Sequence, residues 1–129
     1  MRLKTHLKID PDFSGRLVKL KEGFAEVELE TKDFMAADER GLVHGGFTFS
    51  AADFAAMAAI NEEFVVLTGA EVKFLAPVVV GQRVLFRASV LKKEGPKADV
   101  AVEGFVEEKK VFGGTFHTYT PKKHILDKA

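Results

Sequence analysis

The sequence contains no cysteine and no tryptophan, and it has one tyrosine against twelve phenylalanines. Without cysteine the chain can form no disulfide bond and offers no thiolate, which fits a cytoplasmic protein. Its nineteen basic and nineteen acidic residues cancel, so no overall field draws the protein to nucleic acid. The phenylalanines either fill an ordinary core or line a pocket for an apolar ligand.

Long hydrophobic runs are missing as well. The most apolar stretch, residues 47–60, is too short to cross a membrane and contains an acid, Asp53. The N-terminal residues 1–13 lack the apolar core of a signal peptide. The sequence has no G-x-S-x-G motif, no Walker loop and no G-x-G-x-x-G motif, which argues against a serine hydrolase and a nucleotide-binding site. The histidines lack ligand spacing, so we expect no metal.

The length of 129 residues favours one domain, and no internal repeat or linker divides it. Residues 1–15 have weak periodicity and predict a partly ordered lead-in, with one helical turn near residues 3–9. Pro11 and Gly15 are expected to break any helix around them. Residues 121–129 predict a frayed tail.

Alternating apolar and polar residues predict strands on both sides of a central apolar segment. Residues 16–30 predict a hairpin that turns at Glu22 and Gly23, with one face in the core and an acidic face in water. Residues 31–44 form a connection without periodicity. Four further alternating segments have short connections and predict an antiparallel meander; they cover residues 64–77, 83–93, 98–108 and 110–120.

The central segment predicts a helix over Gly46–Asn61. Alanine dominates it, and phenylalanine, methionine and isoleucine supply most of the rest. A helix that is apolar nearly all round must be buried nearly all round. One flat sheet covers only one side of such a helix, so we expect a strongly curled sheet, a second subunit, or both. The predicted fold class is α+β.

Asp53 is the one acid in this apolar helix. Burying a carboxylate is costly unless the charge is compensated. Asp53 is therefore either satisfied by backbone amides or an arginine across an interface, or used for chemistry. The segment His44-Gly45-Gly46 precedes it, and free amides at a helix start can polarise a carbonyl and hold the oxyanion formed when it is attacked. Asp53, two turns along, would act as a base on water or as a nucleophile. The alternative is that His44 caps the helix beside a glycine hinge.

Several other residues are candidates for substrate binding. Met57 lies four residues after Asp53 and shares its helix face. Lys92, Lys93 and Lys97 cluster around one predicted turn, where they either contact phosphates or are simply solvated.

Two stretches resemble the hotdog-fold acyl-CoA thioesterases of the phenylacetate-degradation (PaaI-like) family. The first carries His44-Gly45-Gly46, followed by an acid nine residues after the histidine. The second is KFLAPVVVGQRV, in which Phe74 and Pro77 match the family's Phe-x-x-Pro pattern and Gly81 matches the glycine turn behind it.

The resemblance, which covers about residues 15–120, implies a single hotdog domain: a curled antiparallel sheet of about five to six strands wrapped around one long central helix. It implies a homodimer or homotetramer with active sites between protomers, acyl-CoA as substrate and no cofactor. By this resemblance Asp53 is the general base or nucleophile, and the Gly45 amide polarises the thioester carbonyl. His44 shapes the turn, and Gly46 lies beside the substrate.

The chain departs from this family at two positions. The family often has asparagine or glutamine six residues before the histidine, where this chain has Asp38, which cannot donate an amide hydrogen bond unless it is protonated. Some relatives carry a hydroxyl at the position of Met57, and Thr68 in the next strand is the residue here that would substitute for it. These departures suggest slow turnover or an unusual acyl group.

Residues from about 60 onward are also similar to the effector domain of bacterial fatty-acid-synthesis repressors, which bind malonyl thioesters without hydrolysis. Such repressors have an N-terminal helix-turn-helix and lack an acid at the position of Asp53. Only about 15 residues precede the first predicted strand here, so hydrolysis is the favoured function. A non-catalytic acyl-CoA or malonyl-CoA sensor is the alternative. A hotdog dehydratase comes third, because its hydration signature is not evident.

Overall fold

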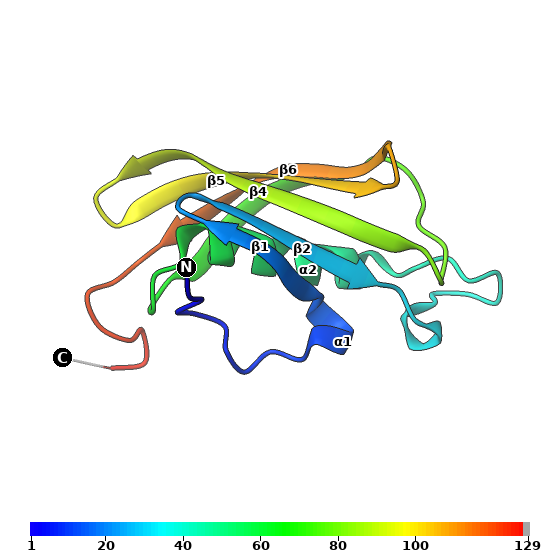
Figure 1. Ribbon diagram of the computed structural model, residues 1–129, viewed down its shortest axis with the longest axis horizontal. Coiled ribbons are helices and arrows are strands. Elements are labelled where there is room, and N and C mark those ends of the chain that lie inside the picture. Colours follow the sequence, from blue (N-terminus) through cyan, green and yellow to red (C-terminus); the bar gives the residue numbers. More distant parts are fainter. Residues whose placement is uncertain (128–129) are drawn as a thin grey trace.

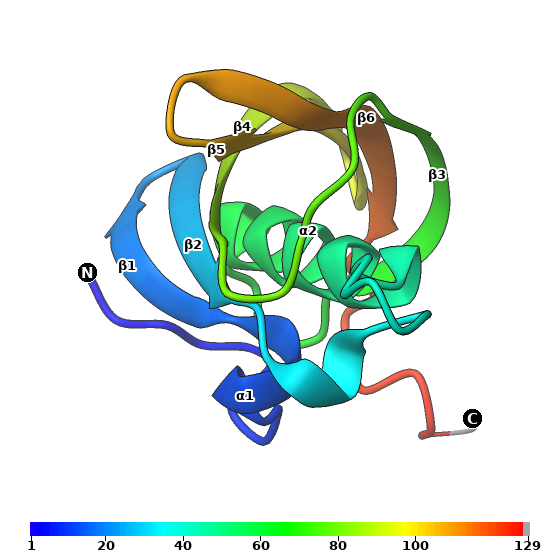
Figure 2. The same cartoon turned by 90° about the vertical axis from the view of Figure 1, so that its right-hand side faces the viewer.

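The computed structural model describes residues 1–127, which fold as a six-stranded antiparallel sheet around one long helix (Figure 1). The strand order is β1-β2-β4-β5-β6-β3. Figure 2 shows the sheet curling around the helix from β1 on one side to β3 on the other. This is the predicted hotdog fold, and its sheet does not close. The elements are α1 (Pro11–Ser14), β1 (Arg16–Lys21), β2 (Phe24–Glu30), the 3-10 helix η1 (Asp33–Met35), α2 (Gly45–Ile60), β3 (Val66–Phe74), β4 (Arg83–Glu94), β5 (Lys97–Val106) and β6 (Lys109–Tyr119).

The predicted N-terminal hairpin is confirmed. β1 and β2 pair antiparallel across a two-residue turn, in which Gly23 has a φ of 72°. This left-handed conformation costs glycine little and other residues more. Three apolar residues of β2 are fully buried in the core with α2, and they are Ala25, Val27 and Leu29.

The predicted four-strand meander is wrong in one strand. β4, β5 and β6 are consecutive neighbours, but β3 pairs with β6 at the far edge, and β4 pairs with β2 instead. The connection from β3 to β4 crosses the start of α2, where the Val43 amide donates to the Val78 carbonyl at 2.8 Å. Leu42 and Val79 form a bridge beside this bond. A short connection favours adjacent strands but does not require them.

The tight curve of the sheet requires glycine at two positions where neighbouring chains pass closely. A β-carbon at Gly114 would lie 2.7 Å from Val72 Cγ1 on the paired strand. A β-carbon at Gly104 would lie 2.8 Å from Phe86 Cε1. Because neither separation is possible for real side chains, these two glycines let β5 and β6 pass close to their neighbours.

The predicted helix is confirmed to within one residue at each end. α2 begins after His44 and ends before Asn61, whose left-handed φ of 52° stops the helix. Its alanines are buried and let the helix pack closely, mostly against β2 and β4 and less against β3 and β6. Among the described helices none has the length and hydropathy of a membrane span.

The predicted helical turn near residues 3–9 is wrong, because the turn comes later, at Pro11–Ser14. Proline suits the first position of a helix, where its missing N–H has no partner to lose, and Asp10 caps the turn by accepting from the Asp12 amide at 2.9 Å. Pro11 thus begins this short helix rather than preventing it. Of the predicted tail, residues 121–127 are irregular and residues 128–129 lie outside the described residues.

Candidate active site

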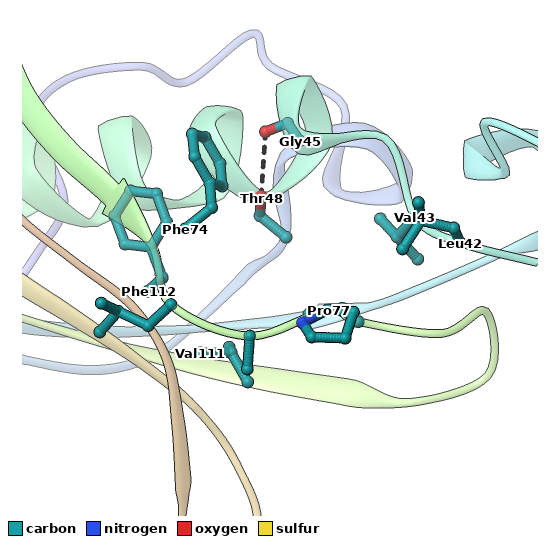
Figure 3. A pocket seen from close by; sticks show the side chains of 11 residues that line it. Leu42, Val43, Gly45, Thr48, Phe74, Pro77, Val111 and Phe112 are labelled. Carbon is teal, nitrogen blue, oxygen red and sulfur yellow. Dashed lines mark hydrogen bonds between the residues drawn. The ribbon is translucent and has the colours of Figure 1, made fainter.

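A pocket of about 370 Å³ lies at the start of α2. It is formed where the β3–β4 connection crosses the first turn of the helix, with β6 as its third wall (Figure 3). The residues that line it are Leu42, Val43, Gly45, Thr48, Phe74, Leu75, Ala76, Pro77, Val78, Val111 and Phe112. Gly45 of the predicted site is among them.

Each of the two glycines in the His-Gly-Gly turn is required for a different structural reason. A β-carbon on Gly45 would lie 3.1 Å from Cε1 of Phe74, so a side chain there would push on the pocket wall. A β-carbon on Gly46 would lie 3.0 Å from Nε2 of His44, whose ring folds back over the turn. His44 thus shapes the turn by packing rather than by capping, since its side chain makes no cap hydrogen bond.

The turn before α2 is held on both sides. The His44 amide donates to the Met35 carbonyl at 2.8 Å. Inside the helix, the Thr48 hydroxyl donates to the Gly45 carbonyl at 2.9 Å. Amides in the first turn of a helix have no acceptor within the helix itself. A fixed turn therefore presents them, with the positive end of the helix dipole, beside an apolar pocket.

Asp53 is half-buried on α2. Within residues 1–127, its Oδ1 is the one fully buried side-chain nitrogen or oxygen that lacks a hydrogen-bond partner. Burial raises the pKa of this carboxyl from 3.8 to about 6. In the described part of this chain, neither a backbone amide nor an arginine therefore satisfies Oδ1, which was the alternative to a chemical role. A carboxyl with this pKa can accept a proton near neutral pH.

One chain does not bring Asp53 to the turn that should polarise the substrate. Gly45 and Asp53 are eight residues apart on α2, which separates them by about 12 Å along the helix axis. A carbonyl oxygen bound to the Gly45 amide would lie about 3 Å from it. Asp53 of the same chain therefore cannot reach that carbonyl, although two turns looked close enough in the sequence.

The surroundings of Asp53 come partly from the lead-in. The Ser50 hydroxyl, one turn before Asp53, lies 2.7 Å from the Ser14 hydroxyl at the end of α1. The ring of His6 stacks on Phe54 with centroids 6.4 Å apart, and burial lowers the pKa of His6. No sequence motif indicated these contacts, because the lead-in lacks periodicity.

The residues expected to assist Asp53 have other tasks in this chain. Met57 is fully buried in the core. Asp38 is exposed, and its Oδ1 accepts from the amides of Arg40 at 3.0 Å and Leu42 at 3.2 Å, so it holds its own turn. Thr68 is exposed at an irregularity of β3, where its hydroxyl donates to the His117 carbonyl at 3.1 Å. None of the three lines the pocket.

The three lysines lie at the other end of the molecule. Lys92, Lys93 and Lys97 are exposed at the β4–β5 hairpin, near the end of α2 rather than its start (Figure 1). Lys93 lines a cleft with Ile60, and Lys92 pairs with Glu94 at 3.3 Å. A single chain therefore does not bring them to the pocket.

Sequence reasoning missed several pocket residues. Phe74 was noted only as part of a family pattern, and Thr48 and Phe112 were not singled out. The one available signal was the apolar alternation of Phe74 with its neighbours, which marks one face of a strand without showing what lies opposite.

Residues 40–113, which include the pocket turn and α2, match the family model described as Thioesterase superfamily. The chain belongs to the Thioesterase superfamily. Its curated relatives include a protein of Aquifex aeolicus (strain VF5) named methylthioribose-1-phosphate isomerase, 53% identical over 118 residues, which are 92% of this chain and 26% of that protein. The transcription factor FapR of Exiguobacterium sp. is 32% identical over 81% of this chain and 57% of its own length. The chain thus spans about a quarter of the first relative and about half of the second.

Solved structures with this fold agree closely. An uncharacterized protein of Pyrococcus horikoshii is 47% identical, with 98% of both chains covered and a TM-score of 0.97. A variant of the phenylacetic acid degradation protein PaaI from Thermus thermophilus is 27% identical over 84% of this chain and 95% of its own, with a TM-score of 0.78. A hypothetical thioesterase of Streptococcus pneumoniae TIGR4, solved with coenzyme A, shares the fold at 14% identity, covering 84% of this chain and 87% of that one with a TM-score of 0.76.

Proposed function

We propose that the protein hydrolyses acyl-CoA thioesters to a free acid and CoA. The observation that carries this proposal is the buried, unpartnered carboxyl oxygen of Asp53, whose pKa is raised to about 6. A structural carboxylate would have a partner, whereas a general base must keep a lone pair free. Membership of the Thioesterase superfamily and the coenzyme A in one structural neighbour support the substrate class.

The proposed reaction uses two groups of the protein. The Gly45 amide donates to the thioester oxygen and holds the negative charge that develops there. Asp53 takes a proton from water while the water oxygen bonds to the carbonyl carbon. The tetrahedral intermediate then collapses, the carbon–sulfur bond breaks, and the proton on Asp53 passes to the leaving CoA sulfur. In the variant of this scheme with a nucleophilic Asp53, its carboxylate attacks the carbonyl carbon, the carbon–sulfur bond breaks and the CoA thiolate leaves and takes up a proton. Water then hydrolyses the resulting anhydride, which releases the free acid and restores the carboxylate of Asp53.

Because one chain holds Gly45 and Asp53 too far apart, the proposed enzyme is at least a homodimer. β3 is the edge that suits a second copy: it has nine residues and pairs only with β6 in the described chain. Phe74 and Leu75 at its end are 56% and 50% exposed. The other edge, β1, has six residues and carries an arginine and two lysines, charges that discourage pairing.

Pairing of β3 with a second β3 about a two-fold axis would continue the sheet and set the two α2 helices antiparallel. Gly45 of one protomer would then approach Asp53 of the partner subunit, giving two equivalent sites. The same symmetry would bring the lysine end of one protomer toward the site of the other, and we expect Lys93 to contact the CoA phosphates there.

The first test compares thiol release by the wild type and three variants on a panel of acyl-CoAs. We expect Asp53→Asn to lower kcat by at least about a hundredfold, since a general base contributes that much or more. Gly45→Pro removes the amide hydrogen at a helix position that tolerates proline, and we expect a loss of about a hundredfold. Gly45→Ala adds the same β-carbon but keeps the amide, so it separates the lost hydrogen bond from crowding against Phe74. Equal rates for wild type and Asp53→Asn would refute the catalytic role of Asp53.

The second test asks whether the two groups come from different chains. Mixed dimers of Gly45→Pro and Asp53→Asn subunits contain one site with both changes and one site with neither. With random assortment, half of the dimers are mixed and half of their sites are intact, so we expect about a quarter of the wild-type activity to return. No recovery after verified subunit exchange would place both groups in one chain.

A second candidate function is acyl-CoA or malonyl-CoA binding without turnover. The observations that favour it are the likeness to FapR and the residue at position 38, an aspartate that has no amide to donate and whose Oδ1 accepts two bonds within its own turn. Calorimetry distinguishes the two functions: tight binding of malonyl-CoA without thiol release supports a sensor, and rapid turnover of any acyl-CoA excludes sensing as the sole function.

A further inference from the structure

We propose that the pocket at the start of α2 selects an uncharged, apolar acyl group of up to about twelve non-hydrogen atoms, and that Phe74 sets this limit. The inference rests on the proposed thioester hydrolysis, because it takes the carbonyl bound at Gly45 as the point from which the acyl chain enters. Gly45 itself lies on the pocket wall (Figure 3).

The side chains of the pocket wall offer no charged partner for a carboxylate, and the Gly45 amide is taken up by the thioester carbonyl in the proposed reaction. Of the eleven wall residues, only Thr48 has a polar side chain, and its hydroxyl already donates to the Gly45 carbonyl at 2.9 Å. The other side chains are aliphatic or phenyl groups. Alkyl and phenyl groups are favoured on such a surface by the apolar area that they remove from water.

The nearest lysines in the sequence face away from this pocket. Lys73 and Lys110 each adjoin a wall residue, but both line a cleft on the opposite face of the sheet. Lys110 is paired there with Glu103 at 2.7 Å. Neither lysine could therefore pair with a malonyl carboxylate in the pocket, and desolvating such a charge without a partner is strongly unfavourable. This separates the site from one built to recognise malonyl thioesters.

The volume sets the size of the acyl group. If each non-hydrogen atom is given the roughly 30 Å³ that a water molecule occupies in the liquid, a pocket of about 370 Å³ holds about twelve of them. Phe74 packs edge to face on Phe112 with ring centroids 5.4 Å apart. In the single chain Phe74 is 56% exposed at the end of the β3 edge and is not part of the buried core, so removing its ring opens the pocket without creating a cavity in that core.

The substrate test uses the purified protein and matched acyl-CoAs. Butyryl-CoA and malonyl-CoA differ chiefly in the terminal carboxylate, and we expect kcat/KM for malonyl-CoA to be at least about a hundredfold lower. Across straight chains, kcat/KM should rise to an optimum between about eight and twelve carbons and fall beyond it. Malonyl-CoA turnover within threefold of butyryl-CoA would overturn the proposal, as would an undiminished rate with sixteen carbons.

Two variants test the named residues. Phe74→Ala should move the optimum to longer chains by two or more carbons, whereas Phe105→Ala, on the outer face beside Arg87, should leave it unchanged. Leu42→Arg places a cation on the rim, where Leu42 is 41% exposed, and should narrow the preference for butyryl-CoA over malonyl-CoA at least tenfold. Leu42→Met is the size-matched control. An unchanged chain-length profile in Phe74→Ala removes Phe74 from the proposal.

Binding measurements keep the two proposals separate. Dissociation constants are measured by calorimetry for the same acyl-CoAs on Asp53→Asn, which should bind without turning over. If no acyl-CoA is hydrolysed by the wild type but the butyryl-over-malonyl preference persists in binding, the proposed hydrolysis fails and the pocket inference stands. If hydrolysis occurs without that preference in kcat/KM or binding, the pocket inference fails and the proposed function stands.

Discussion

The Nδ1 atom of His117 lies 2.7 Å from Oδ1 of Asp99, on the face of the sheet that points away from α2. The other ring nitrogen, Nε2, lies 3.0 Å from Oε2 of Glu71. The protonated ring donates to both carboxylates and so links β5, β6 and the edge strand β3. These contacts, that with Asp99 first, raise the pKa of His117 above its usual 6.5.

We expect Asp99→Asn to lower the pKa of His117 more than Glu71→Gln does. NMR titration of the His117 ring protons measures both pKa values. The stabilising contribution of this group is complete below the unfolded-state pKa and is lost as pH rises through the raised folded-state pKa. Above that pH, the amides of β3 should therefore lose protection against hydrogen exchange. This loss should be larger in the wild type than in Asp99→Asn. A larger fall in pKa for Glu71→Gln would reverse the assigned order of the two carboxylates.

Two adjacent glycines of β6 should respond differently to the same substitution. A β-carbon on Gly114 would lie 2.6 Å from the Glu71 carbonyl oxygen and 2.9 Å from Val72 Cα, and both are backbone atoms that cannot move aside. One on Gly113 would meet Cε of Lys110 first, at 3.3 Å, which is near the end of a flexible side chain. We expect Gly114→Ala to lower the free energy of unfolding by about 2 kcal/mol or more, and Gly113→Ala by less than about 1 kcal/mol. Equal losses in urea unfolding would show that this close approach is relieved in solution.

The sequence predicted what depends on neighbours along the chain. The hairpin at Gly23 and the helix that ends at Asn61 follow from alternation and from apolar spacing, which are local. The placement of β3 beside β6 was missed because it depends on where a connection crosses α2, and no residue of β3 records that. The lead-in was misplaced for a related reason: Pro11 was taken only as a helix breaker, although it also suits a helix start.

The candidate site likewise has features that the local sequence indicates and features that only the fold determines. Gly45 and Asp53 were proposed as site residues because a glycine turn and a lone acid in an apolar helix are local anomalies. Their separation along one helix is also a local property, but the distance between them was underestimated from the sequence. The pocket wall around Phe74 could not be predicted, because it joins three segments that are distant in the sequence. The task of Asp38 depends on the fold of its own turn, which the residue type alone does not specify.

Asn61 is expected to stabilise the protein through two hydrogen bonds to the lead-in. Its Oδ1 accepts from the Lys4 amide at 2.8 Å, and its Nδ2 donates to the Arg2 carbonyl at 3.0 Å. Asn61→Ala should lower the free energy of unfolding by about 2–3 kcal/mol, because it removes both bonds and places alanine at a positive φ. Asn61→Gly removes the bonds without the backbone strain, so it should lose less than Asn61→Ala.

Thermal and urea unfolding of the two variants measure the difference, and hydrogen exchange at the Lys4 amide reports the bond itself. An Asn61→Gly variant as stable as wild type, with unchanged exchange at Lys4, would show that the amide bonds contribute nothing to stability.

Asp53 should cost the protein stability at neutral pH. Its folded-state pKa of about 6 lies above the ordinary 3.8, so the folded state binds the proton more tightly than the unfolded state does. The contribution of this group to stability is therefore highest below pH 4, falls as pH rises from about 4 to about 6, and is level above. Asn in place of Asp removes this loss, and we expect Asp53→Asn to be more stable than wild type at pH 8 by roughly 1–3 kcal/mol. The gain should vanish as pH falls toward 4.

Urea unfolding at pH 4 and pH 8 measures this dependence, and the exposed Asp38→Asn is the control that should show no such gain. The same Asp53→Asn protein should be nearly inactive, so stability and catalysis would change in opposite directions at one residue. A variant less stable than wild type at pH 8 would mean that ionised Asp53 has a favourable partner in solution. That result would remove the argument that its free oxygen is kept for chemistry.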